Sequence, residues 1–397
     1  MKININILSA FALILSLLQT GVYSQSNIDN VLKEISKNNK SIIANTQLQE
    51  SRKLEYQTGQ SLYNPFVEVT NLFGQSGDNG SQLEFKLIQS FDFPTSYSKR
   101  NKVSGLKIQQ TDFEKQIMRR EILLEAKLTC IELICLNKKK IQMLKRVETA
   151  GSLLNLYQTK LEKGEGNILD VNKSKINLLN LKTDLVLIEN EIEELNEKLT
   201  GLNAGNIIVF ADTSYPVTQV IPQFEILENE IEISDPSIKS LQQEKLISQS
   251  QVELSKSLSL PKFEVGYYYL GLRDTKYNGI HFGISIPLWE NNYRTDYHRS
   301  KTLYSNLEIE AHLNDHLYEI KKLYGKYETL KEAMTGYRET LVSSDNVDIL
   351  NKALIAGEIT SINYFLEAQY LYTSFDKFLE LEKEYNIIIA ELYKHKL

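Results

Sequence analysis

The feature that most constrains the fold is an internal duplication, in which two stretches of the chain correspond at a constant offset of 193 residues without a gap. Pro94 corresponds to Pro287, Gly164 to Gly357 and Glu165 to Glu358. A series of apolar residues in the first stretch also corresponds, in order, to a series in the second: Leu178, Leu185, Ile188, Ile192, Leu195 and Leu199 with Leu371, Phe378, Leu381, Tyr385, Ile388 and Leu392. A solenoid needs at least three stacked repeats to bury a core. A unit that occurs twice therefore predicts a chain folded into two matching halves.

Residues 1–24 predict a secretory signal peptide. Lys2 supplies a positive charge, residues 3–18 are largely apolar, and Ser24 provides a small residue before Gln25. A buried first helix is the alternative, although core helices seldom begin with this order of segments. Because no other apolar run of 18 residues and no Cys near the cleavage point exist, we expect an exported protein without a spanning helix or a lipid-bearing Cys.

Composition argues against several functions. The formal charge of −6 and the absence of a basic run argue against nucleic acid as a partner. Cys130 and Cys135 lie five residues apart in a helical stretch, so their side chains point about 140° apart. We expect free, buried thiols and no Cys-based metal site.

One histidine pair requires an enzymatic alternative. His312 and His316 lie four residues apart on one helical face, as in a zinc-protease motif, but Asp315 replaces the glutamate base and no third ligand is placed. We interpret the pair as a solvated helix surface, with a weak metal contact as the alternative. We predict no enzymatic activity, no cofactor and no metal site.

Proline placement predicts very long helices. No proline lies between Pro94 and Pro216 or after Pro287, and proline inside a helix costs about 3 kcal/mol. A helix from Tyr97 to Glu162 would be ~100 Å long. After this helix, apolar residues at heptad spacing form a seam, which predicts packing against neighbouring helices. The seam consists of Leu178, Leu181, Leu185, Ile188, Ile192, Leu195, Leu199 and Leu202.

Two short turns are predicted between the long helices. Gly164 and Gly357 suit the left-handed residue that ends a helix, while Asn167 and Thr360 are good N-caps for the helices that follow. These features predict two helical hairpin tips.

Strand patterns precede both long helices. Residues 83–91 and 280–286 alternate with one mostly apolar face, and each has a partner upstream, at 66–73 and 263–270, across turns at 74–80 and 271–279. Such strands fit a membrane barrel wall, with a soluble hairpin packed on helices as the alternative. Four strands cannot close a barrel, so further copies of the chain must complete the wall.

The predicted fold class is mainly α with membrane β, built from a duplicated strand pair and long helical hairpin. The division is a signal peptide (1–24), a first repeat (25–202), a linker (203–235) and a second repeat (236–397). Each repeat has a helix followed by two hairpins: β-hairpin 65–93 and helical hairpin 97–202 in the first, β-hairpin 261–287 and helical hairpin 290–397 in the second.

This duplicated plan resembles the TolC-like outer-membrane efflux proteins over essentially the whole mature chain. The resemblance rests on the hairpins ending in Phe91-Asp92-Phe93-Pro94 and Ser285-Ile286-Pro287-Leu288-Trp289, and on the tip glycines with their following helices. It implies a homotrimer with a 12-strand β-barrel in the outer membrane, continued by a 12-helix α-barrel across the periplasm. It also implies passive export of substrates supplied by an inner-membrane pump through a periplasmic adaptor.

The resemblance also assigns residues to roles. Adaptor contacts are expected at Gly164, Glu165, Asp170, Gly357 and Glu358, and a periplasmic constriction at Asn363, Tyr364 and Glu367. Asn363 and Leu366 stand where other members have acids, which weakens an acidic ring.

The exported substrate is not encoded in an evident motif. The modest length and short linker are similar to members that serve heavy-metal cation pumps, with drugs or secreted peptides as alternatives. The rival function is a periplasmic adaptor or another exported coiled-coil structural protein, which would have one helical hairpin and a membrane anchor.

Overall fold

The computed structural model describes residues 27–74, 80–216, 220–343 and 347–397, so the predicted signal peptide and most of the predicted turn at 74–80 lie outside the described residues. The chain divides into two compact units. The first comprises residues up to Asn39, Leu123–Gln219 and Tyr327–Ala390, and the second comprises Lys40–Ile122, Val220–Lys326 and Glu391–Leu397.

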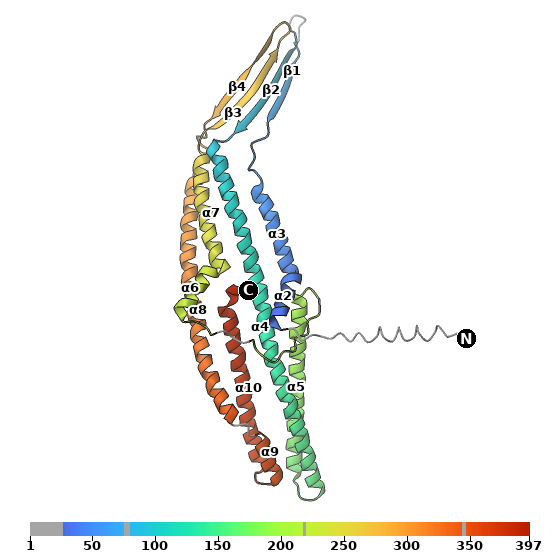
Figure 1. Ribbon diagram of the computed structural model, residues 1–397. Helices are drawn as coiled ribbons and strands as arrows, with labels where there is room; N and C mark the ends of the chain where they lie inside the picture. Colours follow the sequence, from blue (N-terminus) through green and yellow to red (C-terminus); the bar gives the residue numbers. More distant parts are fainter. Residues whose placement is uncertain (1–26, 75–79, 217–219, 344–346) are drawn as a thin grey trace, which may run out of the picture. The chain divides into compact units, whose positions relative to one another are not determined.

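Helices dominate the described chain (Figure 1), as the proline pattern predicts. They are α2 (Ile28–Asn38), α3 (Lys40–Gln57), α4 (Pro94–Glu162), α5 (Ile168–Leu202), α6 (Phe224–Ser234), α7 (Pro236–Leu258), α8 (Arg294–Ser343), α9 (Val347–Ala356), α10 (Ser361–Leu392) and the short η1 (Lys394–Lys396). The longest, α4, runs for 69 residues. In the described part of the chain, none of these helices carries an apolar stretch of the length that crossing a bilayer requires.

The duplication is visible in the order of elements. Each half has two helices separated by a break, then a strand pair, then a helical hairpin. The break falls at Asn39 in the first half and at Asp235 in the second. The last part of the predicted equatorial or linker segment, 203–235, forms α6, which corresponds to α2. Buried Leu227 and Ile231, four residues apart on one face of α6, explain why this glutamate-rich run is helical.

The four strands form one antiparallel sheet in the order β1-β2-β3-β4, with β1 at Phe66–Leu72, β2 at Gln82–Phe91, β3 at Lys262–Gly271 and β4 at Lys276–Ser285 (Figure 1). The turn predicted at 271–279 is too long. β4 begins at Lys276, opposite Gly271, and the Leu272 N–H donates to the Thr275 carbonyl over 2.8 Å. The pairing of β3 with β4 thus extends further than the sequence suggested.

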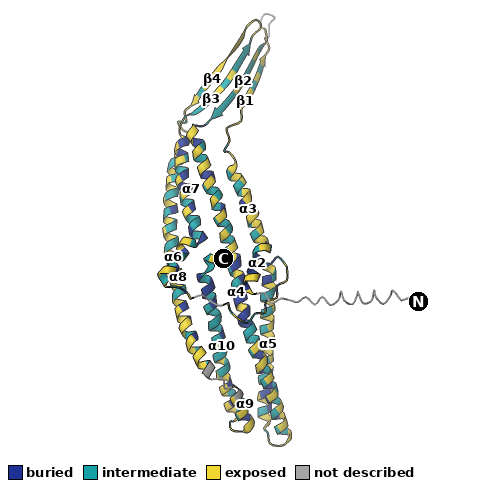
Figure 2. Cartoon of the chain, viewed as in Figure 1, coloured by how far each residue is buried: buried dark blue, intermediate teal, exposed yellow. Residues whose placement is uncertain are grey.

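Apolar side chains from α2, α4 and α10 form the core of the first unit, where dark-blue segments mark buried residues in Figure 2. Cys130 and Cys135 lie within it as buried thiols, as predicted. Burial raises the pKa of Cys130 to about 12 and that of Cys135 to about 11. At the helix break, the Asn39 side-chain amide donates to the Leu202 carbonyl over 2.8 Å, which ties α2 to the end of α5.

The corresponding helix break in the second unit, at Asp235, is stabilised by charged contacts. Asp235 is 1% exposed and accepts hydrogen bonds from Arg120 Nη1 at 2.8 and 2.9 Å, while its carboxylate caps α7 through the Ser237 N–H. His316 Nε2 lies 3.7 Å from Asp235 Oδ2, and His316 is 9% exposed. The interpretation of His316 as solvated surface is therefore wrong, because its helix packs that face against the α6–α7 break.

We expect Asp235→Asn to lower the stability of the purified protein at neutral pH by about 3 kcal/mol, because Arg120 would lose its buried counter-charge. Burial favours the protonated carboxyl, but the His316 ring, the Arg120 charge and the Ser237 N–H outweigh it, so the pKa of Asp235 is lowered from 3.8. The stabilisation is then fully present above about pH 4 and is lost as the pH falls through the folded-state pKa.

Thermal unfolding followed by circular dichroism at pH 7 and below pH 4 measures this difference. The matched control is Asp296→Asn, whose carboxylate pairs with Arg299 on an exposed helix surface and should change little. Equal melting of the Asp235→Asn variant and the unsubstituted protein at pH 7 would contradict the prediction.

Candidate functional site

The register of the sheet gives it two chemically different faces. In an antiparallel sheet, directly paired residues lie on the same face. One face is mostly apolar: Val67, Val69, Leu83, Phe85, Leu87, Phe91, Phe263, Val265, Tyr267, Tyr269, Ile280, Phe282 and Ile284. The other carries most of the charged and polar side chains: Glu68, Glu84, Lys86, Ser90, Glu264, His281 and Ser285. The predicted alternation with one apolar face is confirmed.

The apolar face has no cover within the described chain. Ile280 and Phe282 are each 74% exposed, and β4 is exposed along nearly its whole length (Figure 2). On the opposite face, Lys86 lies 3.5 Å from both Glu68 and Glu84, so charges there compensate one another. The alternative of a soluble hairpin packed on helices does not agree with this exposure.

The two outer strands, β1 and β4, each pair with only one neighbour. Their outer edges therefore present backbone N–H and C=O groups that have no partner strand in this sheet. Such edges are tolerated in water, but in lipid each unsatisfied group costs several kcal/mol.

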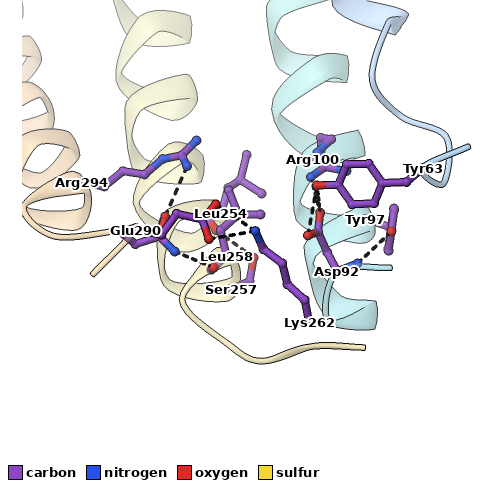
Figure 3. Close-up of polar contacts among 11 residues, drawn as sticks. Tyr63, Asp92, Tyr97, Arg100, Leu254, Ser257, Leu258, Lys262, Glu290 and Arg294 are labelled. Atoms are coloured by element: carbon purple, nitrogen blue, oxygen red, sulfur yellow. Dashed lines mark hydrogen bonds and ion pairs between the residues drawn. The ribbon is translucent and has the colours of Figure 1, made fainter. Parts of the chain in front are cut away.

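Polar clamps lie where the sheet joins the helices (Figure 3). Between β2 and α4, the buried Asp92 carboxylate accepts hydrogen bonds from Arg100 Nη2 at 2.7 Å and from the Tyr63 hydroxyl at 3.3 Å. Near β4, Lys262 Nζ donates to the Glu290 carboxylate at 2.8 and 2.9 Å. The first contact joins the end of β2 to α4, and the second joins the start of β3 to the segment between β4 and α8.

The hairpin tips have the same geometry in both halves. Gly164 has φ 75° and Gly357 φ 78°, so both adopt the predicted left-handed conformation. The N–H of Glu165 donates to the Lys160 carbonyl and that of Glu358 to the Ala353 carbonyl, each over 2.9 Å. The Gly164 N–H also donates to the Leu161 carbonyl over 3.0 Å and the Gly357 N–H to the Leu354 carbonyl over 3.1 Å, which completes a Schellman motif at each tip.

Both predicted N-caps are confirmed. The Asn167 side chain accepts from the Leu169 N–H at 3.0 Å, and the Thr360 hydroxyl oxygen accepts from the Asn363 N–H at 3.3 Å. A Cβ placed on Gly164 or Gly357 would meet no atom within 4 Å, so both glycines face open space. Both tip glycines therefore have open space on the side where a side chain would project.

Within the first unit, the two helical hairpins pack on each other above their tips. The cluster contains Leu153, Tyr157, Val171, Leu354, Tyr364 and Ala368. Tyr364 is 3% exposed, and its hydroxyl donates to Asn351 Oδ1 over 2.8 Å. The Tyr364 ring thus lies in this core, on the helix face that it shares with Ala368, and its place in a periplasmic constriction stays a prediction.

The other predicted residues lie on the surface of this unit. Glu165 and Glu358 are exposed beside the tip glycines, Asp170 is half-buried in the first turn of α5, and Asn363 and Glu367 are exposed on α10. The structure thus places the predicted tip residues at two turns and leaves Asn363 and Glu367 on the surface of α10.

Sequence reasoning missed a charged clamp between α4 and α10. Arg146 is 7% exposed and donates to both oxygens of Asp376, at 2.9 and 2.7 Å, while its guanidinium lies 4.4 Å from the Tyr372 ring centre. A signal was present, because Arg146 occupies a seam position in a heptad series of buried residues on α4: Met143, Ala150, Leu153 and Tyr157. A charge at such a position requires a partner.

A second apolar stripe on α5 was also missed. The predicted seam is half-buried, with Leu199 fully buried, but Ile176, Leu179, Val186 and Leu187 on another face of the helix are 53–64% exposed. An apolar stripe of this length on a helix normally packs against another element.

At the sequence level the chain matches no protein-family model and no curated protein. At the level of structure, it is similar to several solved channels. CusC, known from crystal structures concerning conformational changes in folding and transmembrane channel formation, matches with TM-score 0.77 and 12% identity, over 94% of this chain and 95% of CusC.

Two further structures agree. The Campylobacter jejuni CmeC outer membrane channel matches with TM-score 0.69, 13% identity and coverage of 93% and 85%. The Neisseria gonorrhoeae MtrE outer membrane channel in its open state matches with TM-score 0.70, 11% identity and coverage of 93% and 88%. The chain therefore has the fold of outer-membrane channels. It is the TolC-like fold that the sequence resemblance predicts.

Tip geometry yields a prediction about Gly164. We expect Gly164→Val to raise amide hydrogen exchange in residues 160–168 roughly 5–30-fold, because a left-handed β-branched residue costs about 1–2 kcal/mol. Gly164→Asn is the matched control, since Asn tolerates this conformation. Hydrogen exchange with mass spectrometry measures both. Equal exchange in the two variants would contradict backbone strain as the cause, since a Cβ at position 164 meets no atom of the surrounding residues within 4 Å.

Proposed function

We propose that this chain is one subunit of a passive conduit in the outer membrane, extending into the periplasm and forming the outer part of an efflux or type I secretion system. The observation that carries the proposal is the four-stranded sheet, which exposes an apolar face and has two open edges. The fold shared with outer-membrane channels supports it.

The sheet supports assembly with further copies. Strands with lipid on one face and water on the other must form a closed barrel, because no edge can remain unpaired in hydrocarbon. Pairing β4 of one copy with β1 of the next satisfies both edges. Three copies then make a 12-strand barrel, the size that the resemblance to TolC-like proteins implies, with the Lys86 face towards the bore.

The helices support the same assembly. The exposed apolar stripe of α5 would be buried by helices of an adjoining copy in a tunnel of 12 helices. A conduit of this kind needs no catalytic group or cofactor, because substrates move through a water-filled bore.

The tips supply the contact with the rest of the system. Between α5 and α10 in the first unit lies a groove of about 500 Å³, whose lining includes Leu181, Phe365 and Tyr372. A helical hairpin of a periplasmic adaptor would lie in this groove, as an amphipathic helix binds an apolar furrow. The inner-membrane pump chooses the substrate, for which we retain heavy-metal cations ahead of drugs or secreted peptides.

An adaptor or other exported coiled-coil protein is the weaker proposal. It would have one helical hairpin, whereas this chain has α4–α5 and α8–α10 together with a single four-stranded sheet.

A charge on either face of the sheet tests the proposal. We expect Phe282→Lys to reduce the amount of heat-modifiable oligomer in the outer-membrane fraction, because a lysine facing lipid costs about 2–4 kcal/mol at the bilayer midplane. His281→Lys adds the same charge on the adjacent residue, which faces the bore, and should assemble normally. Fractionation followed by electrophoresis of unheated and heated samples measures the oligomer. Normal assembly of Phe282→Lys, or an equal loss in both variants, would contradict the membrane role.

A further inference from the structure

A polar groove of about 380 Å³ lies among α3, α4, α7 and α8 of the second unit, below the sheet. It is separate from the hairpin tips and from the two faces of the sheet. Its lining is mostly polar and charged, which is unusual for space between packed helices, where apolar contacts normally dominate.

Four buried polar atoms at this groove have no hydrogen-bond partner. They are Gln60 Oε1, Gln251 Oε1, Ser255 Oγ and His298 Nδ1. Ser255 as a whole is only 1% exposed. Buried polar atoms in folded proteins are nearly always paired, so four unpaired atoms around one groove leave hydrogen-bonding positions that a bound molecule can fill.

Positive charge dominates the lining. Arg100 is occupied by Asp92, but neither Lys107 nor Arg294 lies within ion-pair distance of a carboxylate in the described chain. Lys107 Nζ lies 5.2 Å from the Tyr56 ring centre, and Arg294 Nη1 donates to Asn291 Oδ1 over a long 3.4 Å. Glu55 is the sole carboxylate in the lining.

The neutral groups add donors without adding charge. Burial, with the charges of Arg294, Lys301 and Lys107, lowers the pKa of His298 below 6.5, so its ring is neutral at pH 7 and either nitrogen can carry the proton. Ser255 has a free hydroxyl, and a half-turn of the Gln251 amide presents N–H donors instead of oxygen. Phosphate oxygens are usually bound by lysine and arginine side chains, together with hydroxyl groups and imidazole N–H groups.

We propose that this groove binds a phosphate group, carried either by a free anion or by a lipid headgroup, held by Lys107, Arg294, Ser255 and His298. The tetrahedral phosphate accepts hydrogen bonds from several directions, which suits donors that come from three helices. The free-anion form of the proposal does not depend on the conduit function, whereas the lipid form fits a site just below a membrane-embedded sheet.

Calorimetric titration of the delipidated, full-length protein in detergent tests this inference. The probes are inorganic phosphate and, separately, a short-chain phosphatidylglycerol below its critical micelle concentration. We expect Lys107→Gln with Arg294→Gln to weaken binding about tenfold or more, because both charged donors are lost. The control is Lys102→Gln with Arg299→Gln, which removes two exposed charges from the same helices and should leave binding unchanged.

Binding of phosphate identifies a free anion, and binding of the lipid alone identifies a headgroup; both support the proposal. Ser255→Ala provides a variant without a change of charge, and should weaken binding while leaving the thermal midpoint of the ligand-free protein unchanged. The proposal is overturned if neither probe binds, if the Lys107/Arg294 variant binds as tightly as the unsubstituted protein, or if the control pair weakens binding equally.

Discussion

The rest of the structure depends on backbone hydrogen bonding at the edges of the sheet. β1 and β4 leave their outer edges unpaired, and the sheet exposes Ile280, Phe282 and Ile284 on a continuous apolar face. Neither feature suits a protein that works alone in water, and neither suits a single sheet in lipid, where unpaired backbone groups are costly. Closure with further copies removes both difficulties, which is why we place the chain in a multi-subunit wall.

The helices follow the same logic. Duplication gives each strand pair its own helix pair and its own helical hairpin, but the two halves are fixed by different chemistry. The break at Asn39 uses neutral amides, whereas the break at Asp235 uses the Arg120 guanidinium beside His316. Equivalent helix breaks have thus been stabilised twice with different side chains.

Much of the fold could be predicted because its signals are local. The absence of proline predicts α4, the glycines at 164 and 357 predict left-handed turns, and alternation predicts a two-faced sheet, all of which the structure contains. Contacts between distant segments could not be predicted. The Arg146–Asp376 clamp joins residues 230 apart, and the burial of Tyr364 depends on how two hairpins pack. The helical nature of 224–234 and the burial of His316 were missed for the same reason, since both depend on which face meets a neighbouring helix.

The central claim is that one chain forms only a third of a closed wall. Native mass spectrometry of the signal-free protein, released from detergent micelles, measures the number of chains directly. The account predicts a complex of three copies that requires detergent to remain in solution. A stable monomer that stays dissolved without detergent would contradict it, because the apolar face and open edges of the sheet would then need no partner.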